Sequence, residues 1–179
     1  MHVLFMREHN RIVDILKKIN RRWNGERLYQ ETRKILTGIY QHIVYNEFLP
    51  ALLGNNLVDY YGLYPWSNGY STQYDVNADA GTRNAFGAAA FRLGHSLVGS
   101  LIGSYDQDFR LRTTTPMERE FFNSRTVRDS MRFGVDGMSR WMLNQFTSEG
   151  DRFLTSSVRN HLFETKPGNG FDLRYTNVL

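Results

Sequence analysis

The sequence predicts a mainly α protein whose helices are joined by long ordered loops. Apolar residues recur at helical spacing over several stretches, capping residues precede those stretches, and no convincing alternation of apolar and polar residues marks a strand. No internal repeat is present. With 179 residues and 41% hydrophobic side chains, the chain is large enough for one modest core.

Two amphipathic helices are expected in the N-terminal part of the chain. Residues 2–20 place apolar side chains at the spacing of one helical face, with arginines and lysines opposite. Asn24 is suited to cap a second helix, with Glu26 in the first turn, where an acid is favoured. The apolar pattern of this helix continues to Pro50 and Gly54, which we expect to end it.

Aromatic and small residues dominate the next part of the chain. Residues 55–77, rich in Tyr, Gly, Asn and Ser, have no clear period and are expected to form an ordered aromatic loop. Asp79 then begins a third expected helix, in which small and apolar residues recur three and four positions apart. This helix covers residues 79–102, with the sequence DAGTRNAFGAAAFRLGHSLVGSLI.

Shorter helices are expected towards the C-terminus. Residues 115–118, Thr-Pro-Met-Glu, combine a capping box with proline at the first helical position, so a fourth helix should start there and Gly134 should interrupt it. Further short helices should follow around residues 136–145 and 149–163. Residues 171–179 are left as a tail.

Composition excludes several classes of function. The chain has no cysteine, which rules out disulfides, zinc–thiolate sites and a thiol nucleophile. The net charge of +4 arises in residues 1–34, where nine Lys or Arg face four acids. These charges follow the pattern of a solvated helix face, so we expect no nucleic-acid partner. The N-terminus lacks the features of a signal peptide, and no apolar run approaches the roughly 20 residues of a transmembrane helix.

The chain lacks the common motifs of hydrolase, nucleotide and zinc sites. The chain has no GxSxG elbow, no Walker loop and no GxGxxG. None of its histidines forms a HExxH or other zinc pair. The five histidines are His2, His9, His42, His95 and His161. His9 in REHNR and His161 in RNHLFE lie beside charged neighbours on expected helices, where packing or surface roles are typical.

His95 differs from the other histidines in its surroundings. The preceding residues 87–90, Gly-Ala-Ala-Ala, and Gly94 leave little side-chain bulk near the imidazole, so a flat group could lie close to it. Arg92, three residues earlier, lies on nearly the same helical face and is spaced to reach an anion at the edge of such a group. Haem iron with its propionates fits both features. On spacing alone, however, a tight helix crossing is the more common role of such a stretch.

Four blocks of sequence resemble the animal haem peroxidase family, and they occur in the family's order. REHNR, WNGERLYQETRKI and YNEFLPALLG, within residues 4–54, are similar to the segment that follows the family's distal arginine motif. YDVNADAGTRNAFGAAAFRLGHSLV is similar to its proximal helix, whose FRxGH pattern supplies the axial histidine. The resemblance extends through nearly the whole chain with two further blocks, FFNSRTVRDSMRFGVDGMSRWM and DRFLTSSVRNHLFE. It is most similar in character to invertebrate peroxidases.

The resemblance assigns roles to three residues. His95 would be the axial ligand of iron in haem b, with or without covalent links to the protein, and Arg92 would pair with a haem propionate. Residues 172–177 keep the Asp, Leu and Asn of the family's DLxxLN stretch but depart from it at Arg174 and Thr176. Asn177 is matched to the Asn that accepts the N–H of the proximal imidazole.

The resemblance also implies that important parts lie outside the chain. Residues 1–179 would be part of one catalytic domain, without its distal-side N-terminal part and its C-terminal part. The family's distal histidine, distal arginine and calcium ligands lie upstream of the matched region, so no catalytic residue is assigned here and little turnover is expected from the chain alone. The complete protein would be secreted and would use hydrogen peroxide to oxidise a halide, a phenol or a tyrosine.

Two other functions are compatible with the sequence. A fatty-acid oxygenase of the cyclooxygenase type shares the superfamily and the REHNR helix, but carries a radical-forming tyrosine three residues before the axial histidine. Arg92 occupies that position here, which favours a peroxidase. A non-catalytic adhesion or scaffold module derived from a peroxidase is the other alternative. Retention of His95 and Arg92 argues against complete loss of haem binding.

Overall fold

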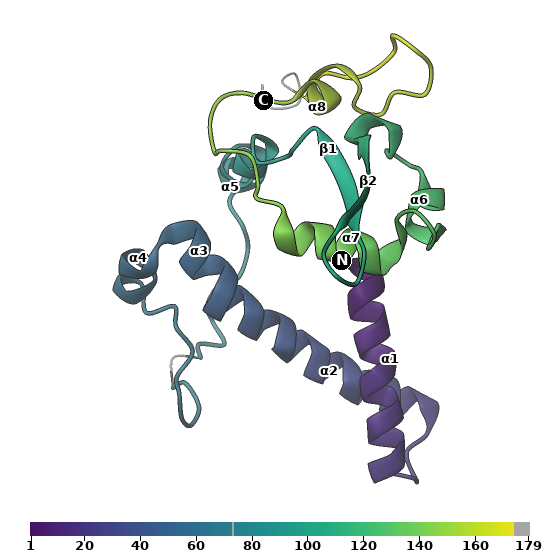
Figure 1. Ribbon diagram of the computed structural model, residues 1–179. Helices are drawn as coiled ribbons and strands as arrows, with labels where there is room; N and C mark the ends of the chain where they lie inside the picture. The colour runs from purple at the N-terminus through teal and green to yellow at the C-terminus, as the bar shows by residue number, and fades with distance from the viewer. Residues whose placement is uncertain (73, 174–179) are drawn as a thin grey trace. The chain divides into compact units, whose positions relative to one another are not determined.

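The computed structural model describes residues 1–72 and 74–173, which fall into two compact units, Met1–Ala78 and Asp79–Leu179. Helices are the main secondary structure, which confirms the predicted mainly α class. Figure 1 shows the elements and their labels.

Unit 1 is built on the helical pair α1 (His2–Ile19) and α2 (Gly25–Ile43), as the sequence predicts. The side chain of Asn24 accepts a hydrogen bond from the backbone N–H of Arg27 at 2.9 Å, so the predicted N-cap is confirmed. The ring of Phe5 on α1 meets Tyr40 on α2 edge-on, with centroids 5.2 Å apart. Buried Ile12 and Leu28 form part of the small core.

The second helix continues past Pro50 through a widened turn. A π-helical turn, η1 (Val44–Phe48), joins α2 to α3 (Leu49–Leu53), and the helix ends at Gly54 with a φ of 79°. Proline has no N–H to donate and its ring crowds the preceding turn, so a local wide turn accommodates it within the helix. The expectation that Pro50 ends the helix was wrong, whereas Gly54 is confirmed as its end.

The aromatic segment after Gly54 begins with a helix that the sequence did not predict. α4 (Asn55–Tyr60) buries Val58 completely, and the Tyr64 hydroxyl donates to the Asn55 side chain at 3.0 Å. The following described residues lie mostly in turns and irregular backbone, as expected. Tyr70 is 94% exposed.

Unit 2 contains the largest departures from the predicted helices. The expected helix over residues 79–102 is replaced by α5 (Asn84–Ala88), the 3₁₀ helix η2 (Ala90–His95) and strand β1 (Leu101–Tyr105). β1 pairs antiparallel with β2 (Leu111–Pro116), Leu101 facing Pro116 and Tyr105 facing Leu111. The sequence analysis predicted no strands, and this prediction was wrong.

The fourth helix does not start at the predicted capping box. Thr115 and Pro116 end β2, and only the short 3₁₀ helix η3 (Met117–Arg119) follows. The Glu118 carboxylate does not close a capping box but accepts a hydrogen bond from the Ser157 hydroxyl at 2.5 Å. The capping-box prediction failed because a distant residue binds the carboxylate that would have completed it.

Three helices complete unit 2: α6 (Ser124–Arg128), α7 (Gly134–Asn144) and α8 (Ser156–Asn160). α7 confirms the helix expected near residues 136–145, but α8 covers only part of the one expected over 149–163. α7 packs on β1 through glycines, because a Cβ on Gly137 would collide with the Ser104 hydroxyl, and one on Gly103 with the Trp141 ring. Ser104 is fully buried there and donates to the Phe133 carbonyl.

Taken together, the two units expose more surface than compact domains of their size. The accessible area is 14515 Å² for a 20.9 kDa chain, whereas a compact monomer of that mass has about 9,000 Å², and two separate compact units would total roughly 11,000 Å². Large apolar side chains such as Leu143 (80% exposed) and Phe146 (91%) account for part of the excess. Apolar surface is therefore left uncovered in these units.

Candidate functional site

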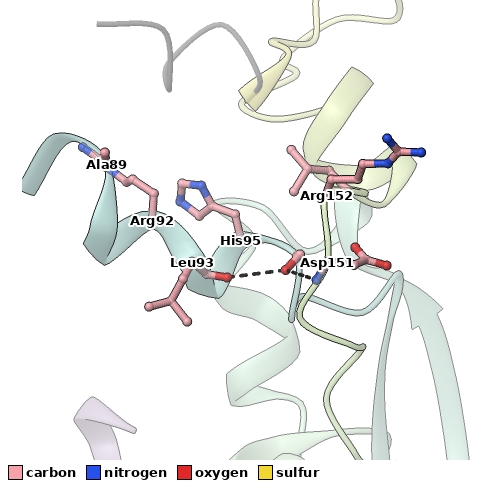
Figure 2. Close-up of a pocket in the computed structure, with 8 residues that line it drawn as sticks. Ala89, Arg92, Leu93, His95, Asp151 and Arg152 are labelled. Carbon is pink, nitrogen blue, oxygen red and sulfur yellow. Dashed lines mark hydrogen bonds between the residues drawn. The ribbon is translucent and has the colours of Figure 1, made fainter. Parts of the chain in front are cut away.

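A pocket of about 460 Å³ lies beside His95 in unit 2. This volume falls within the range of roughly 300 to 1,000 Å³ that is usual for small-molecule and cofactor sites. Figure 2 shows that η2 supplies one wall and the segment before α8 the other. The lining residues are Ala89, Arg92, Leu93, His95, Ser96, Asp151, Arg152 and Leu154.

The His95 wall owes its shape to a break in the helix at Ala89. Ala89 has φ −127° and ψ −66°, outside the helical region, and separates α5 from η2. The Nε–H of Arg92 donates to the Gly87 carbonyl at 3.1 Å. In a continuous α-helix this carbonyl would accept from the N–H of Phe91, so the arginine replaces one helical hydrogen bond.

The opposite wall is tied to the His95 turn by hydrogen bonds. The Asp151 N–H donates to the Ser96 hydroxyl oxygen at 3.2 Å, and this hydroxyl donates to the Leu93 carbonyl at 3.4 Å. The Ser148 N–H donates to the Leu97 carbonyl at 3.1 Å. Ser96 is 8% exposed, so these bonds are largely shielded from water. Residues far apart in sequence thus form one pocket.

The His95 imidazole combines a buried nitrogen with a position on the pocket wall. Its Nδ1 is buried and has no hydrogen-bond partner among the described residues. A buried polar nitrogen normally has a partner. An axial histidine bound to metal through Nε2 uses Nδ1 to donate to a neighbouring polar group. Asn177, expected to accept that bond, lies outside the described residues.

The charges of the pocket favour an anionic ligand. Arg92 and Arg152 contribute two guanidinium groups, whereas Asp151 contributes one carboxylate. An Asp151 carboxylate oxygen already accepts a hydrogen bond from the Phe153 N–H at 2.7 Å. A group carrying carboxylates could therefore be held beside an imidazole, which is the arrangement that haem requires.

The other histidines with described contacts lie elsewhere. His9 packs its ring against Tyr29 on α2, with centroids 5.4 Å apart. The His42 ring contacts the Asn46 amide one turn further along the helix. The Nδ1 of His161 lies 2.6 Å from a Glu164 carboxylate oxygen, and this hydrogen bond holds the pKa of Glu164 below its ordinary value. None of the three lines the His95 pocket.

The structure brings together two of the three residues singled out in the sequence. His95 and Arg92 line one pocket, as their spacing suggested, while Asn177 is not among the described residues. Sequence reasoning missed Asp151 and Arg152, because both residues lie within the helix expected over residues 149–163. The Ser-Glu-Gly-Asp run of residues 148–151 was the available signal, since such residues favour turns.

Two features are absent from the described part of the chain. No three His, Asp or Glu side chains gather there closely enough to hold a metal ion. No helix among the same residues combines the length and the apolar character needed to cross a membrane.

Comparisons with known proteins match the entire chain. The family model for animal haem peroxidase covers residues 1–179. A chorion peroxidase of Aedes aegypti is 40% identical over 99% of this chain and 22% of its own length, and the human peroxidasin homolog is 39% identical over 99% of the chain and 12% of its own length. Peroxidase A from Dictyostelium discoideum matches in structure with a TM-score of 0.82 and 31% identity, over 97% of this chain and 31% of that protein. The chain thus spans under a third of the length of these relatives.

Proposed function

The chain belongs to the animal haem peroxidase family, and from this premise we propose that it is the haem-binding part of a peroxidase with His95 as the axial iron ligand. The single observation that carries the proposal is the His95 pocket, which combines an imidazole whose Nδ1 is buried without a described partner with two guanidinium groups. An axial histidine would bind iron through Nε2 and leave Nδ1 to donate to a neighbouring polar group, and the guanidinium groups would pair with propionates.

Each pocket residue has a defined task in this proposal. His95 would hold the iron through its imidazole, and the protein environment of Nδ1 would set the basicity of the ligand. Arg92 would pair with a propionate, and the hydrogen bond from its Nε–H to the Gly87 carbonyl would fix the direction of the side chain. Haem held in this way supplies the redox chemistry by which hydrogen peroxide oxidises a halide, a phenol or a tyrosine.

The proton chemistry of peroxide cleavage is assigned to other parts of the protein. We place the distal histidine, the distal arginine and the calcium ligands in a remainder of the catalytic domain that covers the apolar surface exposed here. The chain matches only 22% of the length of the chorion peroxidase and 31% of the length of the Dictyostelium peroxidase, which supports this division. The complete protein would act outside the cell, and the 179-residue chain alone would show little turnover.

Titration with ferric haem tests the proposal. We expect the 179-residue chain to bind one equivalent and to give the absorption spectrum of histidine-ligated haem. A chain that takes up no haem under these conditions would support the adhesion or scaffold alternative instead. Little peroxide-dependent oxidation by the haem-bound chain is expected, because the residues that move the proton are assigned elsewhere.

A further inference from the structure

We propose that Arg152 is a second arginine that holds the carboxylates of the haem, opposite Arg92. This inference rests on the proposed function, because it takes haem to be the ligand at His95. In Figure 2 the Arg152 side chain lies on the other side of the His95 imidazole from Arg92, and its guanidinium group extends away from the imidazole. Both arginines line the same pocket, although they lie on segments far apart in the sequence.

The backbone around Arg152 is fixed to the His95 turn. The residue before it, Asp151, donates its N–H to the Ser96 hydroxyl oxygen at 3.2 Å. Ser148 donates to the Leu97 carbonyl, and a Cβ on Gly150 would stand 3.7 Å from the Leu97 side chain, an ordinary contact distance. The segment therefore follows η2 closely. Arg152 lines the pocket from a segment that is hydrogen-bonded to the His95 turn.

The Arg152 guanidinium is available to an incoming anion. Its Cζ lies 5.1 Å from the centroid of the Phe153 ring, and within residues 1–72 and 74–173 no carboxylate pairs with it. The pocket carboxylate of Asp151 is engaged by the Phe153 N–H. Two guanidinium groups against one engaged carboxylate leave the pocket with a net positive charge. A ligand with two carboxylates matches that charge.

Exposure sets the size of the expected effect. Arg152 is exposed, and exposed ion pairs contribute little because water screens them. A bound macrocycle would displace part of that water and strengthen the pairing. We expect loss of Arg152 to lower haem affinity by roughly three- to tenfold, as for one partly screened charge-assisted contact.

The test compares ferric haem with its dimethyl ester, in which both carboxylates are blocked. Arg152→Leu in the 179-residue chain should bind haem roughly three- to tenfold more weakly than the parent chain, with the histidine-ligated spectrum unchanged. Affinity for the dimethyl ester should be the same in both proteins. Arg152→Lys, which keeps the charge, should recover most of the lost haem affinity. Arg159→Leu changes an exposed arginine of α8 outside the pocket and should have no effect.

Two results would overturn the inference while leaving the proposed function intact. One is haem binding by Arg152→Leu as tight as in the parent. The other is an equal loss of affinity for haem and for the dimethyl ester, because the side chain would then act through packing. A parent chain without a histidine-ligated spectrum would instead overturn the proposed function together with this inference. Far-UV circular dichroism of each variant verifies that the helices are retained.

Discussion

Ser96→Ala should loosen the pocket without touching the iron ligand. The Ser96 hydroxyl accepts from the Asp151 N–H at 3.2 Å and donates to the Leu93 carbonyl at 3.4 Å, near the long limit for such a bond. A typical intramolecular hydrogen bond contributes about 1 kcal/mol, and a shielded N–H left without a partner adds to the cost. Removing the hydroxyl should therefore cost about 1 to 2 kcal/mol in the attachment of the Asp151 segment.

If haem binds only when both walls of the pocket are in place, this free-energy cost lowers the affinity for haem by the same amount. Because 1.4 kcal/mol corresponds to a factor of ten, we expect Ser96→Ala to bind ferric haem roughly five- to thirtyfold more weakly. The assay is a haem titration followed by absorption, with the histidine-ligated spectrum retained at saturation. The bond from Ser148 to the Leu97 carbonyl remains in the variant, so complete loss of binding is not expected.

Ser157→Ala is the matched control for this experiment. Ser157 is also a buried serine of unit 2, 2% exposed, but its hydroxyl donates to Glu118 and it does not line the pocket. The control should lower stability and leave haem affinity unchanged. Equal haem affinity of Ser96→Ala and the parent chain would refute the idea that the two walls act together. An equal loss of haem affinity in both serine variants would mean that general destabilisation, and not the bond between the two walls, causes the effect.

Three further predictions concern stability. The hydrogen bond from Ser157 holds the pKa of Glu118 below its ordinary value of 4.5. The stabilisation from this bond is therefore present above pH 4.5 and is lost as the pH falls through the lowered pKa. Hydrogen exchange in α8 should accelerate over that pH range, and the acceleration should be smaller in Ser157→Ala. Gly137→Ala should lower the free energy of unfolding, measured with a chemical denaturant, by about 1 to 3 kcal/mol, because the new Cβ would meet the fully buried hydroxyl of Ser104. Gly38→Ala is the control: a Cβ at Gly38 has open space around it, so this change should be neutral or stabilising. Asn24→Ala removes an N-cap and should lower the helical signal of α2 and cost about 1 kcal/mol, while an unchanged unfolding curve would contradict the role of the cap.

The sequence predicted best where structure depends on local interactions. Asn24 caps α2 because its side chain reaches a backbone N–H three residues away, and Gly54 ends α3 because it adopts a positive φ readily. The apolar spacing of α1 and α2 is likewise a short-range pattern. Such signals can be recognised without knowledge of tertiary contacts.

Prediction failed where a distant residue or a side chain competed with the local pattern. The small-residue stretch around Ala89 has good helix formers, yet Arg92 bonds the Gly87 carbonyl and the helix breaks. Propensity alone does not hold a helix that lacks packing partners. The β-branched run Thr113–Thr115 was the overlooked signal for β2.

The candidate site shows the same division between local and distant contacts. His95 and Arg92 could be paired from their spacing because they lie three residues apart. Asp151 and Ser96 are 55 residues apart, and the hydrogen bond between them depends on how unit 2 folds. Arg152 could therefore be assigned to the pocket only after the structure had brought the two segments together.

The measurement that tests the central claim most directly is the electron paramagnetic resonance and absorption spectrum of ferric haem bound to His95→Ala. We predict loss of the axial-histidine signature with little change in helix content, because the imidazole is only partly buried on the pocket wall. His9→Ala and His161→Ala, which change histidines outside the pocket, should keep the parent spectrum. If His95→Ala still bound haem with an unaltered axial-histidine spectrum, the assignment of His95 as the iron ligand would be wrong.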